Sequence, residues 1–162
     1  MLTISLPAQA AAFDSKDVSI LGETLHFVVP PPTGKIGIAV VYNEQIPGSQ
    51  MEAQEVAAIF GDTNDSVSGV TMHAFAVSLG MLDKQQFVAV ISAEGAGTPL
   101  LKSIINSHHA VCVTNHLDQV ESGNCQLYVT SQPSVDIRLN QDATDAADVH
   151  FATAFRIMVH TL

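Results

Sequence analysis

The fold is decided by one apolar stretch, Lys35-Ile-Gly-Ile-Ala-Val-Val-Tyr42, which follows a break at Pro30-Pro-Pro32. Its apolar residues are continuous rather than alternating, a pattern typical of a strand that is covered on both faces. Two further runs of this kind are Phe87-Val-Ala-Val-Ile91 and Ala110-Val-Cys-Val-Thr114. We therefore expect a sheet whose inner strands are buried between two layers.

Segments with helical spacing separate these strands. Asp14 can cap a first helix, and Asp17 favours its positive end. Ser49-Gln-Met-Glu52 has the pattern of a capping box for a second helix, and Thr98-Pro99 begins a third. Strands that alternate with amphipathic helices predict right-handed βαβ units and a mainly parallel sheet. The expected fold is an α/β three-layer sandwich.

The remaining segments complete one domain over residues 13–162. A strand is expected over 70–77, and residues 125–130 and 135–139 are expected to form a final strand pair. Asn140 can cap a closing helix that carries Phe151, Phe155, Ile157, Met158 and Val159. This span contains no linker, repeat or low-complexity tract that would divide it.

The composition of the 162-residue chain limits its partners. Its hydrophobic fraction of 47% is enough for one sizeable core, and its charged fraction of 14% is too low for a disordered chain. The formal net charge is −10 at pH 7. Because an acidic surface repels phosphate backbones and anionic lipid headgroups, we expect neither nucleic-acid binding nor binding to a membrane surface.

The first twelve residues predict export. They are apolar and then small, and Ala8-Gln9-Ala10 matches the pattern of a signal-peptidase site. We interpret residues 1–12 as the remnant of a secretory signal, with an ordinary flexible N-terminus as the alternative. No stretch approaches the roughly 20 apolar residues that span a bilayer. The prediction is therefore an exported protein that is not inserted into the membrane.

Cys112 and Cys125 stand 13 residues apart and are the two cysteines of the chain. In an exported protein, an even number of cysteines favours a disulfide. Cys112 also lies within a predicted buried strand, where a free cysteine packs as a small hydrophobe. Both interpretations are open at this point.

A sheet of this kind binds ligands beyond the carboxyl ends of its strands. Three segments are expected there, 43–49, 92–98 and 115–118, and they supply the candidate ligand-binding residues Asn43, Ser92, Glu94, Thr98 and Asn115. The glycines of the second segment allow close backbone approach, and the helix start after Thr98 offers free N–H groups to an anion. Glu94, however, would repel a phosphate.

The alternative for segment 92–98 is a strand-to-helix turn without a ligand, because neither of the glycine-rich nucleotide-binding motifs is present. No cofactor and no metal site are predicted, since the histidines lack a ligand spacing and Asp142, Asp145 and Asp148 lack the calcium-loop pattern. We also expect no catalysis, because no motif pairs a nucleophile with a base. An enzyme would need a cluster that includes His116 and Asp118.

The C-terminal third resembles the ending of YfiR-like periplasmic proteins. The residues that carry the resemblance are Gly123-Asn-Cys-Gln-Leu-Tyr-Val129 and the segment from Val135 to Val149, followed by a phenylalanine-rich helix. The earlier order of a helix with Phe27, a proline break and a first strand is also similar. The layout further resembles a single lobe of ABC-type periplasmic substrate-binding proteins, through Val40-Val-Tyr-Asn43.

These resemblances imply a periplasmic location and two alternative functions. The YfiR-like resemblance implies a non-catalytic regulatory module that restrains an inner-membrane signalling partner, such as a diguanylate cyclase, by protein contact, often as a homodimer. The binding-lobe resemblance implies a small-molecule ligand held by the strand-end loops. Replacing Asn43 and Thr98 should abolish binding in the second case and leave a partner complex intact in the first.

Overall fold

The computed structural model of the protein describes residues 13–60 and 69–162. The segment 1–12, interpreted above as a signal remnant, lies outside the described residues. Every helix in the described ranges is too short or too polar to cross a membrane.

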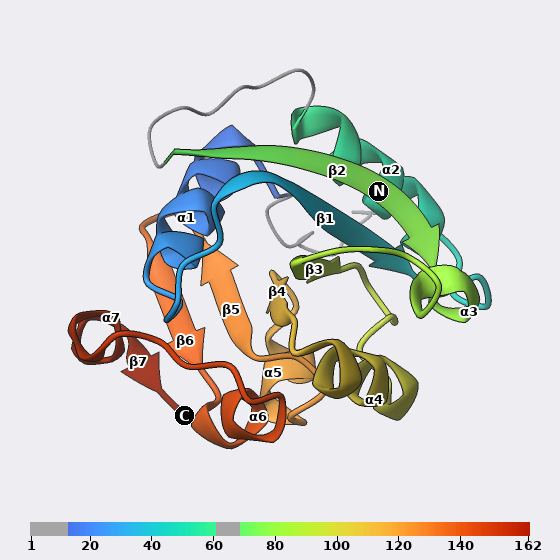
Figure 1. Ribbon diagram of the computed structural model, residues 1–162. Helices are drawn as coiled ribbons and strands as arrows, with labels where there is room; N and C mark the ends of the chain where they lie inside the picture. Colours follow the sequence, from blue (N-terminus) through green and yellow to red (C-terminus); the bar gives the residue numbers. More distant parts are fainter. Residues whose placement is uncertain (1–12, 61–68) are drawn as a thin grey trace, which may run out of the picture.

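The described residues form a seven-stranded sheet in the order β2-β1-β3-β4-β5-β6-β7 (Figure 1). Strands β2, β1, β3, β4 and β5 are parallel, β6 is antiparallel to β5, and β7 is parallel to β6. The strands are β1 (Gly34–Tyr42), β2 (Val70–Ser78), β3 (Ala89–Ser92), β4 (Val111–Thr114), β5 (Leu127–Thr130), β6 (Asp136–Leu139) and β7 (His160–Thr161). The strand order reverses between β1 and β3, because β2 lies on one side of β1 and the later strands lie on the other.

Helices cover both faces of the sheet, which confirms the predicted α/β three-layer sandwich (Figure 1). Helices α1 and α2 pack together on one face, and α3 and α4 pack together on the other. The helices are α1 (Ser15–His26), α2 (Ser49–Phe60), α3 (Leu79–Leu82), α4 (Pro99–His108), α5 (Leu117–Glu121), α6 (Gln141–Ala146) and α7 (Thr153–Met158).

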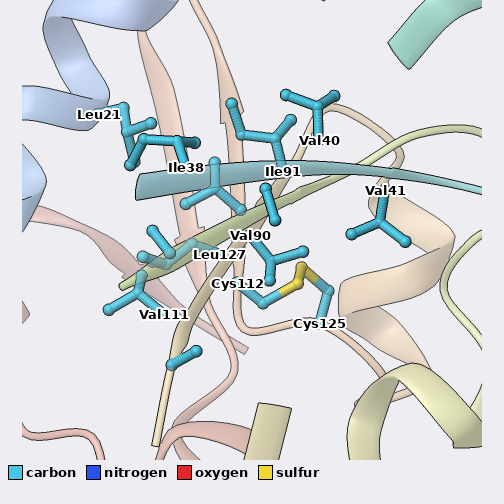
Figure 2. Packing of buried hydrophobic residues seen from close by; sticks show 14 of the residues in the cluster. Leu21, Ile38, Val40, Val41, Val90, Ile91, Val111, Cys112, Cys125 and Leu127 are labelled. Atoms are coloured by element: carbon cyan, nitrogen blue, oxygen red, sulfur yellow. A yellow bond between two sulfur atoms is a disulfide. The ribbon is translucent and has the colours of Figure 1, made fainter. Parts of the chain in front are cut away.

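The core lies around β1, β3 and β4, whose apolar runs are buried as predicted. Ile38 to Val41 are fully buried, and every residue of β3 and β4 is buried. Figure 2 shows side chains of these strands in one cluster with Leu21 of α1. Burial of apolar area stabilises the fold by about 25 cal/mol per Å², so continuous apolar runs belong at the centre of the sheet.

The predicted start of α1 at Asp14 is confirmed. Asp14 accepts hydrogen bonds from the backbone N–H groups of Lys16 and Asp17, and Asp17 completes a capping box. The helix ends at His26, before the prolines, because Val28 pairs with Phe151 in an isolated β-bridge. The extended backbone of that bridge cannot continue a helix.

The single closing helix predicted above is divided in two. Asn140 caps α6 as expected, through a hydrogen bond from the N–H of Ala143, but α6 ends at Ala146. Asp148 then adopts a left-handed conformation with φ of 55°, and α7 starts only at Thr153. Phe151 lies between the two helices, where it forms its bridge with Val28.

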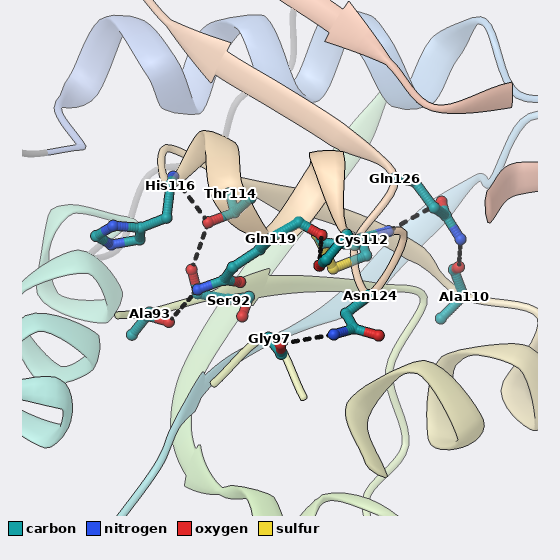
Figure 3. The surroundings of a disulfide bond; sticks show 12 residues. Ser92, Ala93, Gly97, Ala110, Cys112, Thr114, His116, Gln119, Asn124 and Gln126 are labelled. Atoms are coloured by element: carbon teal, nitrogen blue, oxygen red, sulfur yellow. Dashed lines mark hydrogen bonds between the residues drawn. A yellow bond between two sulfur atoms is a disulfide. The ribbon is translucent and has the colours of Figure 1, made fainter. Parts of the chain in front are cut away.

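The disulfide alternative is confirmed: Cys112 of β4 is bonded to Cys125, which lies just before β5, with the two Cα atoms 5.2 Å apart. Gln126 holds the same region, because its amide donates to the carbonyl of Ala110 and accepts from the N–H of Cys112 (Figure 3). The bridge thus joins β4 to the segment that leads into the neighbouring strand β5, within the core.

Replacing both cysteines by alanine (C112A/C125A) is expected to lower the free energy of unfolding by about 3 kcal/mol, since a disulfide that closes a loop of this size restricts the unfolded chain. Urea unfolding without reductant measures this difference. Reductant should lower the stability of the native protein and leave the double variant unchanged. Equal stability of the two proteins without reductant would contradict a structural role.

Candidate functional site

The loops that follow β1, β3 and β4 meet at the carboxyl edge of the sheet, next to the reversal of strand order. In open α/β sheets, this position forms the crevice where ligands bind. The predicted residues Asn43, Ser92, Glu94 and Asn115 lie on these loops or at the strand ends, and Thr98 lies at the start of α4. The topology therefore places the predicted set at one edge.

Asn43 joins the loops after β1 and β3. Its side-chain amide donates to the carbonyl oxygen of Gly95 at 2.9 Å. Its backbone N–H donates to Oγ of Ser49 at 2.9 Å, and its Oδ1 accepts from the N–H of Gln45 at 3.0 Å. The position of Asn43 is thus fixed by protein partners on both sides.

Glu52 of α2 contacts the other two loops. One carboxylate oxygen accepts from the N–H of Glu94 at 2.7 Å, and the other lies 2.6 Å from Nε2 of His116. The predicted capping box of Ser49 and Glu52 is therefore wrong. Both side chains have tertiary partners instead, because Ser49 accepts from Asn43 and Glu52 faces the strand-end loops.

The pair formed by Glu52 and His116 is largely removed from solvent, with side-chain exposures of 27% and 18%. Burial lowers the pKa of His116, but the hydrogen bond to Glu52 and the charges of Glu52, Glu94 and Asp118 outweigh this effect. The pKa of His116 therefore lies above its ordinary value of 6.5. A protonated His116 forms a charge-assisted hydrogen bond with Glu52.

The other predicted residues have separate roles. Oγ1 of Thr98 accepts from the N–H of Leu101, so Thr98 is the N-cap of α4. Ser92 is buried at the end of β3, and its carbonyl accepts from Oγ1 of Thr114 at 2.8 Å. Asn115 is half-buried between Thr114 and His116. Of the predicted set, Asn43 bonds to Ser49 and Gly95. Glu94 bonds through its N–H to Glu52, which also contacts His116.

Glycines of the loop after β3 make room for protein side chains. A Cβ atom at Gly95, where φ is +72°, would lie 2.5 Å from the side chain of Ile46, and one at Gly97 would lie 2.4 Å from that of Gln119. The predicted close backbone approach at these glycines is therefore made by Ile46 and Gln119.

Two amide side chains that the sequence analysis missed hold this loop from the far side (Figure 3). Gln119 donates to the carbonyl of Ala93 at 2.8 Å, and Asn124 donates to the carbonyl of Gly97 at 3.0 Å. Oε1 of Gln119 and Oγ of Ser92 are buried without a hydrogen-bond partner in the structure. Such atoms are rare in folded proteins and cost stability.

The rim of this edge is acidic. Glu44 and Glu94 are exposed on its loops and Asp118 is exposed at the start of α5, beside the half-buried carboxylate of Glu52. Within the described part of the chain, no group of three His, Cys, Asp or Glu side chains could hold a metal ion. His108 and His150 pair with Asp83 and Asp148, away from the strand-end loops.

Comparison with protein-family models and with curated protein sequences finds no match. Solved structures share the fold. One is the ABC domain in complex with L-Trp from Streptococcus pneumonia, which is 13% identical with a TM-score of 0.55, covering 86% of this chain and 58% of that one. Another is a conserved domain protein from Vibrio cholerae, which is 14% identical with a TM-score of 0.53, covering 91% of this chain and 59% of that one.

At these identities, the likeness concerns the fold, and this chain spans less than two thirds of each neighbour. The fold shared with the first neighbour is consistent with the layout on which the resemblance to a binding-protein lobe rests. The YfiR-like resemblance stays a prediction.

Replacing His116 by glutamine (H116Q) is expected to destabilise the protein more at acidic than at alkaline pH. The pKa of His116 is raised in the folded state, so its stabilising effect is fully present below an unfolded-state pKa near 6.5 and is lost as the pH rises through the folded-state pKa. We expect a loss of about 1–2 kcal/mol at about pH 5.5 and less at about pH 9, because the charge-assisted hydrogen bond requires protonated His116. Urea unfolding of the native protein and of H116Q at both pH values measures this loss in the free energy of unfolding.

His150→Gln is the matched control, since His150 and Asp148 form an exposed pair, and exposed pairs contribute little. Equal destabilisation by H116Q at both pH values would show that His116 acts through packing alone.

Proposed function

We propose that this chain is a non-catalytic, exported domain that binds a small molecule at the carboxyl ends of β1, β3 and β4. The observation that carries the proposal is the convergence of Asn43, Glu52 and His116 from three separate elements at the reversal of strand order. Ligands of open α/β sheets bind at this position. Oγ of Ser92 and Oε1 of Gln119, which are buried without a hydrogen-bond partner in the structure, lie at the same edge. Such atoms lower the stability of the fold, and proteins keep features of this kind mainly at functional sites.

The shared fold supports this proposal, because a neighbour with the same fold is a domain in complex with L-Trp. Since this chain spans 58% of that neighbour, it is comparable with a part of such a protein. We propose that the strand-end loops form one open wall of the ligand site.

The charges of the site favour a ligand with a positive group. Glu44, Glu94 and Asp118 are exposed around the edge, and the nearby base, His116, is already paired with Glu52. Carboxylates that gather at one rim attract cations and repel phosphates. A small molecule that carries an amine is therefore the proposed ligand class.

Binding without catalysis agrees with the state of a thiol and a hydroxyl in the inner strands. Cys112 is held in the disulfide, and the hydroxyl of Ser92 is buried. Export agrees with the disulfide, because such bonds persist in oxidising compartments. The regulatory module that contacts a diguanylate cyclase stays a prediction without a specific observation in its favour.

The proposal is tested by titrating the purified protein with amino acids and diamines, and with phosphorylated compounds of similar size, by calorimetry or native mass spectrometry. We expect amines to bind and phosphates not to bind. Glu94→Gln should weaken the binding of amines by about tenfold, because it removes one carboxylate from the rim.

Asp142→Asn is the matched control, since Asp142 is an exposed carboxylate on α6 at the opposite edge of the sheet. Binding of amines that is equally strong in the native protein and in Glu94→Gln would contradict the proposed site. Tight binding of phosphates would contradict the ligand class.

A further inference from the structure

A second feature of the molecule is the uneven distribution of its exposed apolar side chains. Met51, Met81 and Leu100 are exposed on separate helices. By contrast, Val135, Ile157, Met158 and Leu162 gather around α7 and the β6–β7 end of the sheet, and Ile157 and Met158 are 80% and 65% exposed. Large apolar groups that gather at one place mark an interaction surface more often than scattered ones do.

This apolar corner borders a groove of about 410 Å³ between α1 and α7. Ile20 of α1 and Phe27, which follows this helix, form one wall. Phe155 and Met158 of α7 form the other, and Ile137 of β6 contributes to the lining. Figure 1 shows α1 and α7 near the β6–β7 end of the sheet. Asn43, Glu52 and His116 do not line this groove, so it is distinct from the strand-end site.

The wall formed by α1 carries opposite charges at its two ends. Lys16 and Glu23 both line the groove, with Ile20 between them. Seven residues are two helical turns, or about 10 Å along the axis. The exposed stripe of α1 therefore has a base at its start, an apolar residue at its middle and an acid two turns later.

We propose that this groove is the interface of a two-fold symmetric homodimer, in which α1 of each copy lies antiparallel in the groove of the other. With the two-fold axis near Ile20, Lys16 faces the partner's Glu23, and Glu23 faces the partner's Lys16. The two Ile20 side chains meet near the axis, and α1 packs beside the partner's Met158. A two-fold interface requires such a self-complementary surface.

The charge pattern selects a second copy over other occupants. An occupant of the groove must present its acid opposite Lys16 and its base opposite Glu23, and an antiparallel copy of α1 meets both conditions. A parallel copy would place each lysine against a lysine. Because the chain carries a net charge of −10, two copies repel each other at long range, and opposite charges at the contact fix their register.

Sedimentation equilibrium over a range of protein concentrations tests this proposal. The native protein should form a dimer. K16E and E23K should each raise the dimer dissociation constant by about tenfold or more, because each places like charges in contact twice. The double variant K16E/E23K should restore the native value, since it exchanges the two charges without changing their pairing.

Mixing the two single variants gives a second measure. An equimolar mixture of K16E and E23K should form a heterodimer more tightly than either variant alone forms a homodimer, because the mixture restores both pairs of opposite charge. A small molecule or a different protein in the groove would not produce this behaviour. Circular dichroism confirms that each variant is folded.

Ile20→Asp should abolish the dimer, and Leu100→Asp, which changes an exposed apolar residue on α4, should leave it intact. A native protein that stays monomeric throughout the concentration range would overturn the proposal. So would a double variant K16E/E23K that dimerises as weakly as the single variants.

Discussion

The burial of β1 on both faces is the constraint on which the rest of the structure depends. Ile38 to Val41 have no contact with solvent, so one layer of helices must cover each side of the strand. Parallel neighbours satisfy the backbone of β1 on both edges, through β2 and β3. Since β1 is followed by β2 on one side and β3 on the other, the reversal of strand order lies beside it. The candidate site is thus a consequence of the buried run that starts at Ile36.

Polar side chains at the carboxyl edge form hydrogen bonds between α2 and the loops that follow β1, β3 and β4. Glu52 reaches from α2 to the loops after β3 and β4, and Asn43 reaches from the loop after β1 to Gly95. These bonds connect helices on one face with loops that lead to the other face. The network therefore combines two roles, because the groups that hold the loops in place also define the charge of the edge where a ligand would bind.

The features that the sequence predicted correctly are those that depend on residues close together in the chain. The inner strands follow from continuous apolar runs, and the starts of α1 and α4 follow from Asp14 and from Thr98 with Pro99. The division of the closing helix could not be predicted, since it depends on the contact of Phe151 with Val28, more than a hundred residues away. Glu52 was misassigned for a similar reason: its pattern fits a capping box, but tertiary partners offer its carboxylate stronger hydrogen bonds. Sequence reasoning expected Asn43, Glu94 and Asn115 beyond the strand ends, and the structure has them on those loops. It missed Gln119 and Asn124, because amide side chains in short helices and turns carry no motif.

The acidic character of the chain connects the two proposals. A net charge of −10 keeps copies apart unless opposite charges meet at close range, and it draws cationic small molecules toward the protein. The groove between α1 and α7 provides the opposite charges for contact between two copies, because Lys16 and Glu23 lie on either side of an apolar centre. The strand-end site attracts cationic small molecules through the exposed carboxylates at its rim. Because the two surfaces share none of their lining residues, a dimer built through α1 leaves the strand-end loops open to a ligand.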